Sequence, residues 1–241
     1  MVVLSRDHYV AMQGNLLTVH LMGAEVHIVD TEDHWELEAD ALALCDRLRD
    51  EGRRPHYIPI SGTTALSCLG YVAGALELAR QFEDQGVGPD VVYLPFGTGG
   101  VFTGMFLTFR ALGNKAPFVG ISVNKTGAEC QQFMDTWWLG ISELLEVDAD
   151  ADRGDYTITN QFVGREYGDP TRAGLEAIAV MVETEGILLD SVYSGKVLSG
   201  LLHDVASGTI EPGSTVVMLH SGGTPALFAY HEAIAAFLET R

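Results

Sequence analysis

Short apolar runs alternate with longer stretches of helical periodicity along this chain. The apolar runs are extended in character, and the longer stretches repeat their apolar side chains every three or four positions. Extended runs cover residues 2–4, 24–29, 57–60, 90–94, 118–123 and 215–219, and helical stretches cover residues 13–22, 35–51, 65–81, 103–111, 129–145, 172–185 and 225–238. This alternation predicts an α/β fold, a parallel sheet with helices on both of its faces.

Three polar, glycine-containing turns lie between an extended run and a helix, at residues 61–64, 97–100 and 221–223. Carboxyl ends of parallel strands meet at one edge of a sheet, so we expect the three turns there. Residues 97–100 read Gly-Thr-Gly-Gly. A strand that ends at glycines and restarts as a helix gathers unpaired N–H groups and the positive end of the helix dipole. The pattern predicts a phosphate site.

The three turns considered by themselves allow other interpretations. A glycine-rich turn can join a strand to a helix without binding anything, and Thr63 or Thr64 can simply cap the helix that follows them. Nucleotide sites are disfavoured, because Phe102 occupies the third glycine position of a dinucleotide-binding pattern. The Gly-Lys-Ser/Thr of a phosphate-binding P-loop is also missing there.

Composition narrows the class of protein. The chain has 241 residues, 47% of them hydrophobic, which suffices for one large or two modest domains. Three widely spaced cysteines argue against a disulfide framework or a metal site, and a reducing cytoplasm is the expected location. No signal peptide or membrane-spanning apolar run is apparent in the sequence. A net charge of −19 would repel nucleic acid and anionic membranes. The acidic, lysine-poor composition suits either a high-salt cytoplasm or an ordinary acidic protein.

Seven segments taken together resemble one enzyme family, because they occur in its order along nearly the whole chain. The segments are QGNLL (13–17), GAEV (23–26), Gly62 with Leu66 and Gly70-Tyr71, GTGG (97–100), EGILLD (185–190), VYSGK (192–196) and HSGGTPALF (220–228). They resemble the D-cysteine desulfhydrase and 1-aminocyclopropane-1-carboxylate (ACC) deaminase family. The resemblance implies the tryptophan synthase β-like fold (PLP fold type II), the cofactor pyridoxal 5'-phosphate, a small amino-acid substrate and a homodimer.

The resemblance also assigns roles to individual residues. Tyr193 would stack on the pyridine ring, although a tyrosine at that place could also be packing alone. Tyr167 would face the substrate, where its hydroxyl could move protons. Ser194 or Ser221 would bind near the pyridine nitrogen. The phosphate would lie on the backbone of Gly97, Thr98, Gly99 and Gly100.

Two of these positions separate the branches of the family. The deaminases carry an acidic residue after the stacking tyrosine and an apolar residue after the histidine of the last glycine turn, whereas the desulfhydrases carry hydroxyls at both. Here the residues are Ser194 and Ser221. The resemblance therefore favours a desulfhydrase, which eliminates from a small amino acid to give pyruvate, sulfide and ammonia. The alternative is an ACC deaminase.

Departures from the family pattern limit this prediction. The Schiff-base lysine of a Gly-Asn-Lys segment and the Ser-Asn-His segment that follows it do not occur at their expected places. We therefore expect an N-terminally incomplete fold, with residues 1–55 the remnant of a smaller domain and residues 56–241 the larger cofactor domain. Lys115, in a turn, Lys125 and Lys196 are poor substitutes. Val101 stands where the family has threonine, and Thr64 where it has asparagine.

The expected consequence is a chain that is inactive by itself. The alternatives are a non-catalytic module that binds the cofactor or an amino acid, and one half of a split enzyme.

Overall fold

The computed structural model describes residues 1–5, 12–31, 33–150 and 153–241 of the chain. The chain divides into two compact units, Met1–Gly62 and Thr63–Arg241. The sequence suggested a division after residue 55. The turn Ile60–Gly62, in which Gly62 N–H bonds to Pro59 O, lies in the first unit.

The first unit contains a small parallel sheet. Its described elements are β1 (Val2–Ser5), α1 (Gly14–Leu21), β2 (Val26–Val29), α2 (His34–Asp50) and the 3-10 turn η2 (Ile60–Gly62). β1 pairs with β2 from Val2 opposite Val26 to Ser5 opposite Val29. Helix α2 packs against β1 and buries Leu44, Cys45 and Leu48 at helical spacing. The expected extended run at residues 57–60 pairs with no strand among the described residues.

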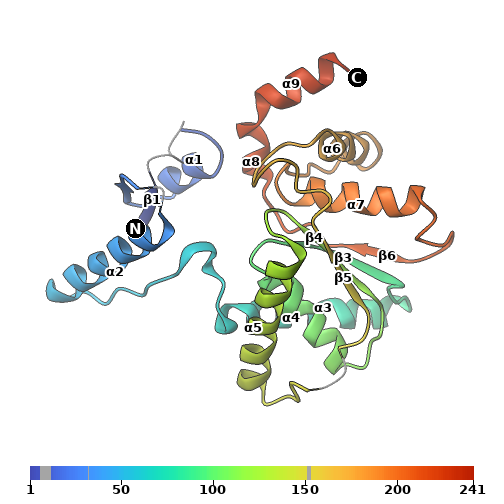
Figure 1. Ribbon diagram of the computed structural model, residues 1–241, viewed down its shortest axis with the longest axis horizontal. Helices are drawn as coiled ribbons and strands as arrows, with labels where there is room; N and C mark the ends of the chain where they lie inside the picture. Colours follow the sequence, from blue (N-terminus) through green and yellow to red (C-terminus); the bar gives the residue numbers. More distant parts are fainter. Residues whose placement is uncertain (6–11, 32, 151–152) are drawn as a thin grey trace. The chain divides into compact units, whose positions relative to one another are not determined.

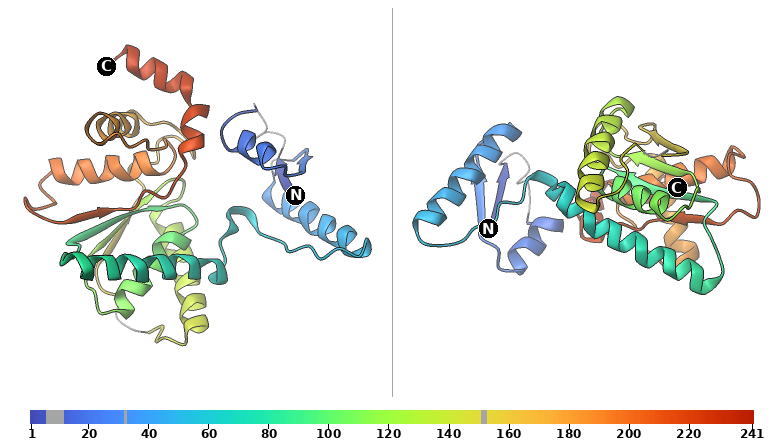
Figure 2. Two further views of the ribbon diagram at one scale, coloured as in Figure 1. Left: turned by 180° about the vertical axis from the view of Figure 1, so that it is seen from behind. Right: turned by 90° about the horizontal axis from the view of Figure 1, so that it is seen from below.

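The second unit holds the larger sheet and most of the helices. Its described elements are α3 (Ala65–Gln85), β3 (Val91–Phe96), α4 (Gly100–Ala111), β4 (Phe118–Ser122), α5 (Gly127–Leu145), β5 (Tyr156–Thr159), α6 (Arg172–Glu185), α7 (Ser194–Ala206), β6 (Val216–Met218), α8 (Thr224–Ala229) and α9 (His231–Glu239). The strands run parallel in the order β5-β4-β3-β6. Figure 1 and the reverse view in Figure 2 show α6 and α7 over one face, and α3, α4 and α5 over the other. The predicted α/β arrangement is confirmed.

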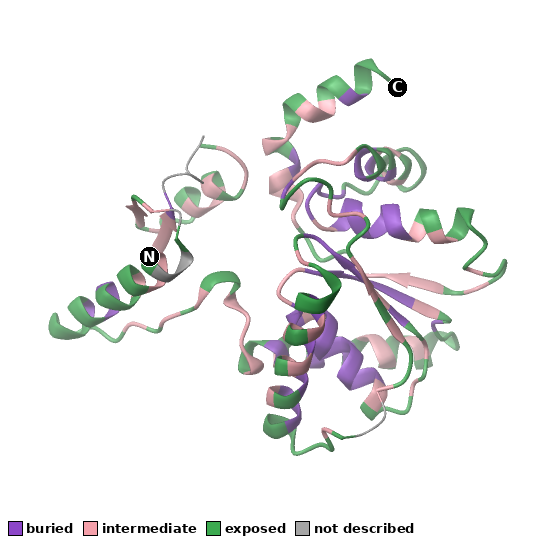
Figure 3. Cartoon of the chain, in the orientation of Figure 1, coloured by how far each residue is buried: buried purple, intermediate pink, exposed green. Residues whose placement is uncertain are grey.

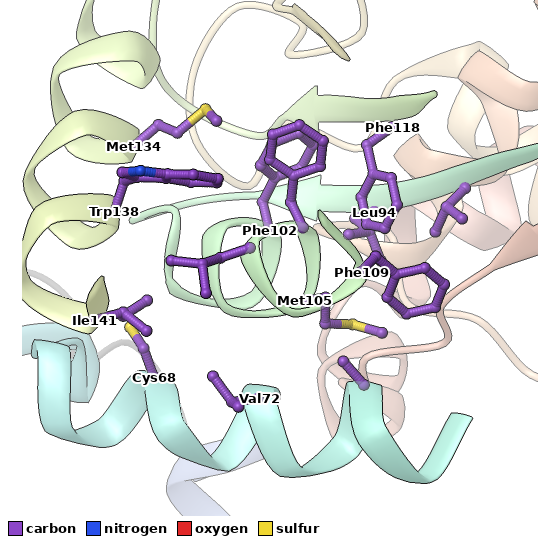
Figure 4. Packing of buried hydrophobic residues seen from close by; sticks show 14 of the residues in the cluster. Cys68, Val72, Leu94, Phe102, Met105, Phe109, Phe118, Met134, Trp138 and Ile141 are labelled. Atoms are coloured by element: carbon purple, nitrogen blue, oxygen red, sulfur yellow. The ribbon is translucent and has the colours of Figure 1, made fainter. Parts of the chain in front are cut away.

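Hydrophobic packing fixes α4 against the sheet. Its side chains are buried nearly all the way round, and Phe102, Phe106 and Phe109 contact Phe118 of β4. Figure 4 shows α3 and α5 closing the same cluster with residues such as Val72 and Trp138. Burying one phenylalanine stabilises a fold by about 1.5–3 kcal/mol. The helix is therefore held firmly, and its N-terminus has a fixed position at the end of β3.

Two elements of this unit were not predicted from the sequence, β5 and α7. Strand β5 is only four residues long and follows an acidic stretch. Helix α7 carries Val197, Leu198, Leu201 and Leu202 at helical spacing, and its first half is buried (Figure 3). A Cβ on Gly200 would come within 2.6 Å of Ile121 Cδ1, so close contact with β4 requires glycine there. The single C-terminal helix expected from the sequence is two helices, interrupted at Tyr230.

Candidate functional site

The N-terminus of α4 begins at the glycine turn that follows β3. Gly99 is its N-cap, with φ +84°, and no side chain caps the helix. A Cβ on Gly99 would stand 2.8 Å from Phe96 Cζ, so only glycine fits. A helix that starts without a capping side chain leaves its first N–H groups open to a ligand, and its dipole favours an anion. This geometry would suit an anion, and the open start of α4 is therefore the candidate anion site.

Two threonine hydroxyls lie beside this turn. Thr98 Oγ1 is 2.5 Å from Thr63 Oγ1, and Thr98 O accepts a hydrogen bond of 2.6 Å from Trp137 Nε1 of α5. A Cβ on Gly100 would come within 2.9 Å of Thr63 Cγ2. The turn is thus held by Trp137 of α5 on one side and by Thr63 on the other. The hydroxyl oxygens of Thr63 and Thr98 lie beside the open N–H groups of α4.

The turn at residues 61–64 serves its helix differently. Thr64 accepts a hydrogen bond of 3.0 Å from Ser67 N, and Thr64 N donates one of 2.8 Å to Ser67 Oγ. This is a complete capping box, so the chain itself satisfies the start of α3. The capping alternative from the sequence holds for Thr64.

Tyr193, the residue before α7, reaches the glycine turn. A Cβ on Gly97 would stand 3.6 Å from Tyr193 Cε1 and 3.7 Å from Val123 Cγ2. Glycine at position 97 therefore leaves the tyrosine ring next to the anion site. The structure brings two sequence-predicted residues together here, from segments almost a hundred positions apart.

Tyr167 lies in the segment after β5 and contacts Tyr193 directly. The two hydroxyl oxygens are 2.7 Å apart, and the rings meet edge to face with centroids 6.1 Å apart. Desolvation of its hydroxyl first, and the hydrogen bond to Tyr193 second, raise the pKa of Tyr167 above its ordinary value. Tyr167 as a whole residue is still 54% exposed. The pair can therefore share a proton at a position that small molecules reach.

Asp190 organises the backbone on which Tyr193 stands. Its buried carboxylate accepts hydrogen bonds of 2.8 Å from the N–H groups of Val192, Tyr193 and Ser194. Ser194 Oγ donates to the same carboxylate at 2.6 Å and accepts from Asp190 N at 2.9 Å. The predicted site residue Ser194 is fully buried, and its hydroxyl is committed to Asp190.

The last glycine turn follows β6, the strand next to β3. Ser221 lies exposed in it, and Gly223 has φ +91°. A Cβ on Gly223 would stand 2.7 Å from Asp190 Cγ, so Asp190 also holds this turn. Sequence reasoning missed Asp190. The available signal was an aspartate shortly before a helix, which is typical of a residue that caps N–H groups.

Each of the three lysines already has a surrounding that accounts for it. Lys115 is exposed in the turn after α4, at the other end of that helix from the glycines. Lys125 Nζ lies 4.7 Å from the ring centroid of Phe133, and Lys196 is buried with its Nζ 2.6 Å from Val163 O. No group of metal-binding side chains occurs among the described residues. Within those residues, no helix has the length and apolar character needed to span a membrane.

Known proteins match this chain over nearly its whole length. The family profile described as "Pyridoxal-phosphate dependent enzyme" matches residues 1–222. The D-cysteine desulfhydrase of Klebsiella pneumoniae (strain 342) is 33% identical over 218 residues, which cover 90% of this chain and 65% of that enzyme. The D-cysteine desulfhydrase of Salmonella newport (strain SL254) is 32% identical with the same coverage. The chain thus spans just under two thirds of the length of these curated relatives.

Solved structures agree with the family match. A crystal structure of an ACC deaminase homologue superposes with a TM-score of 0.85 and 30% identity, covering 98% of this chain and 69% of that one. An L-serine ammonia-lyase from Rhizomucor miehei has a TM-score of 0.65 at 17% identity, covering 99% of this chain and 73% of that one, and shows the fold alone. The expected fold family and the resemblance drawn from the seven segments are confirmed.

Proposed function

This chain belongs to the family of pyridoxal-phosphate dependent enzymes, and on that premise we propose that it binds the cofactor between the glycine turn and Tyr193. The phosphate would lie on the N–H groups at the start of α4, in residues 97–100. The observation that carries the proposal is the meeting of two features: an uncapped helix N-terminus and an aromatic ring 3.6 Å from the Cβ position of Gly97.

The described residues suit this cofactor chemically. A phosphate needs several N–H donors, and the start of α4 offers N–H groups that no side chain caps. Thr98 adds a hydroxyl beside them. The flat face of Tyr193 suits an aromatic ring, and the Tyr193 ring lies beside Gly97.

The partner of the pyridine nitrogen is Ser221 in this proposal. The sequence left Ser194 and Ser221 as equals. Ser194 is buried with its hydroxyl on Asp190, whereas Ser221 is exposed in the turn after the strand that adjoins β3. A serine hydroxyl is neutral, so it would hold the nitrogen without the charge that a carboxylate supplies.

The reaction class that we propose is β-elimination from a small amino acid, as in the D-cysteine desulfhydrases to which this chain is similar. When bound, pyridoxal phosphate supplies the electron sink for such chemistry. The tyrosine pair is the proposed proton carrier, because the Tyr167 and Tyr193 hydroxyls are 2.7 Å apart and Tyr167 stays protonated above its ordinary range. D-cysteine and water would give pyruvate, sulfide and ammonia.

A second candidate activity is ACC deamination. Its support is the structural match to an ACC deaminase homologue at 30% identity. The hydroxyls at Ser194 and Ser221 favour the desulfhydrase, because the resemblance places an acidic and an apolar residue there in deaminases. A chimaera of this chain with a borrowed lysine-bearing N-terminal segment that opens ACC but leaves D-cysteine intact would reverse this preference.

The cofactor would bind to residues 1–241 without a covalent bond to lysine. Lys196 Nζ already donates to Val163 O, Lys125 lies against Phe133, and Lys115 follows the far end of α4. We propose that these 241 residues alone do not turn over substrate, which leaves a binding module and one half of a split enzyme as the other roles. The resemblance also implies a homodimer. This stays a prediction, and sedimentation velocity can test it.

Binding can be measured by quenching of tryptophan fluorescence, since Trp137 contacts the glycine turn through its Nε1. We expect pyridoxal phosphate to quench saturably, and inorganic phosphate to compete. Pyridoxal, which lacks the phosphate, is the control and should bind more weakly by at least about tenfold, given ~1.5–3 kcal/mol for a hydrogen bond to a charged group. Borohydride treatment followed by peptide mass analysis should label no lysine. Equal binding of pyridoxal and its phosphate would refute the phosphate site.

A further inference from the structure

Lys196 is a buried lysine to which the proposed function gives no role. It is the third residue of α7, and its side chain is fully buried. Its Nζ donates a hydrogen bond of 2.6 Å to the main-chain oxygen of Val163, in the segment after β5. Burying an amine without a partner is strongly unfavourable, so this contact helps to fix where the segment meets the helix.

The segment that Lys196 holds is a compact turn ending at Asp169. Asp169 Oδ2 accepts a hydrogen bond of 2.9 Å from Arg165 N, and Asp169 Oδ1 accepts one of 2.8 Å from Arg165 Nη2. A Cβ on Gly164 would stand 2.6 Å from Asp169 Oδ2, so the backbone closes tightly on the carboxylate. Tyr167 lies within this turn. The Val163 contact therefore fixes the start of the turn that carries Tyr167.

Electrostatic interactions also link Lys196 to the segments that carry Tyr167 and Tyr193. Burial lowers the pKa of Lys196, and the carboxylates of Asp169 and Asp190 act in the opposite direction. One of these carboxylates closes the Tyr167 turn, and the other caps the backbone of Tyr193. The lysine is therefore coupled electrostatically to both segments that present a tyrosine hydroxyl.

We propose that Lys196 is a positioning residue that keeps Tyr167 in contact with Tyr193 by holding the carbonyl of Val163. The inference deepens the proposed function, because it explains how two tyrosines from separate segments are kept 2.7 Å apart. A methionine at position 196 would fill nearly the same volume but donate nothing. The turn would then lose its attachment to α7 at Val163, and Tyr167 would leave Tyr193.

The test is a pH titration of tyrosine hydroxyls by NMR, using the 241-residue chain labelled with ¹³Cζ-tyrosine and free of pyridoxal phosphate. Tyr167→Phe assigns the resonance. In the parent chain we expect Tyr167 to titrate above the ordinary value of about 10. In Lys196→Met its pKa should fall toward that value. The matched control is Lys115→Met, which removes an exposed lysine and should leave the Tyr167 titration unchanged.

Each outcome decides the inference. If Lys196→Met folds with the parent's circular dichroism and cooperative unfolding, yet Tyr167 titrates as in the parent, the positioning role is wrong. If Lys196→Met does not fold, Lys196→Gln replaces it, because its shorter amide retains polarity but cannot reach as far. Collapse of both variants would assign Lys196 to fold stability instead. Since no cofactor is present, failure here is separate from failure of pyridoxal phosphate to quench fluorescence.

Discussion

Helices α4 and α7 begin close together, yet they treat their first N–H groups in opposite ways. At α4 the N-cap is Gly99, whose surroundings exclude any Cβ, and the described chain supplies no capping side chain. At α7 the carboxylate of Asp190 accepts three N–H groups and the Ser194 hydroxyl. The start of α4 is open to an anionic ligand, whereas the start of α7 already binds the carboxylate of Asp190.

This difference explains why the two helix starts have different roles in the proposed site. An open N-terminus can bind phosphate because its donors and its dipole are unused. A filled N-terminus cannot, but its fixed backbone holds a side chain at a defined place. Tyr193 takes that place, beside the Cβ position of Gly97. Changes that open the filled end, or fill the open one, therefore test the assignment.

Removing the carboxylate that caps the start of α7 should have the largest effect, and it should act on stability. Asp190→Ala leaves three buried N–H groups and a hydroxyl without their acceptor. We expect a loss of about 3 kcal/mol or more in the free energy of unfolding, since each unpaired buried donor costs ~1–3 kcal/mol. Urea denaturation followed by circular dichroism measures it. Asp135→Ala is the control, because it removes a half-exposed partner of Arg153 and should cost at most ~1 kcal/mol. Equal losses in the two variants would show that Asp190 caps nothing of consequence.

Filling the open end should have the next largest effect. Gly99→Ala places a Cβ 2.8 Å from Phe96 Cζ at a φ of +84°, so the start of α4 must move. We expect a loss of about 2 kcal/mol or more in unfolding free energy, because the left-handed backbone alone costs ~1–2 kcal/mol for a residue with a Cβ. Affinity for pyridoxal phosphate should fall at least about tenfold, the equivalent of ~1.4 kcal/mol.

Gly86→Ala is the matched control for Gly99→Ala. Gly86 ends α3 with φ +65°, and nothing stands within 4 Å of its Cβ position. It should show the backbone strain of about 1 kcal/mol without the collision, and it should keep parent affinity for the cofactor. A similar loss of affinity in both variants would mean that the α4 turn is not the phosphate site.

This contrast also shows what the sequence could and could not predict. The open end was predictable, because a strand, a run of glycines and a helix are adjacent in the chain and their pattern is local. The filled end was not. The role of Asp190 depends on a backbone turn that brings residues 192–194 over its carboxylate, and that turn has no local sequence pattern. Helix α7 also went unpredicted, although its apolar residues recur at helical spacing from Val197 to Val205.

The assignment of the two serines illustrates the same limit. Sequence position places Ser194 next to Tyr193, the proposed stacking residue, and gives no direction for its hydroxyl. Only the fold shows that this hydroxyl turns to Asp190, while Ser221 lies exposed after β6. The fold class and the family, by contrast, followed from periodicity and from seven ordered segments, because neither depends on the orientation of one side chain.

A pair of serine variants separates structural from cofactor roles. Ser194→Ala removes a donor to the Asp190 carboxylate and an acceptor for Asp190 N–H. It should cost about 1–2 kcal/mol of unfolding free energy and change cofactor affinity by less than about twofold, a small fraction of 1.4 kcal/mol. Ser221→Ala should leave stability unchanged and shift the absorbance spectrum of bound pyridoxal phosphate. Urea denaturation and absorbance titrations measure the two effects, and the reverse pattern would make Ser194 the ring partner.

Adding a hydroxyl at the start of α4 should give the smallest effect, and it should raise cofactor affinity instead of lowering it. Val101 is the second residue of α4, at the position where the resemblance places a threonine. The Val101 side chain is partly buried against the core cluster around Phe102. Val101→Thr keeps the branched shape and replaces one methyl group by a hydroxyl in the first turn of α4, where the resemblance implies a contact with the phosphate. A hydrogen bond to a charged group contributes ~1.5–3 kcal/mol. Placing a hydroxyl in a partly apolar surrounding offsets part of this gain, so affinity for pyridoxal phosphate should rise by as much as about tenfold. Affinity for pyridoxal, which lacks the phosphate, should stay the same in fluorescence titrations. A gain for both compounds would place the hydroxyl at the ring rather than at the phosphate, and it would turn the α4 terminus from a phosphate site into a general anchor for the cofactor.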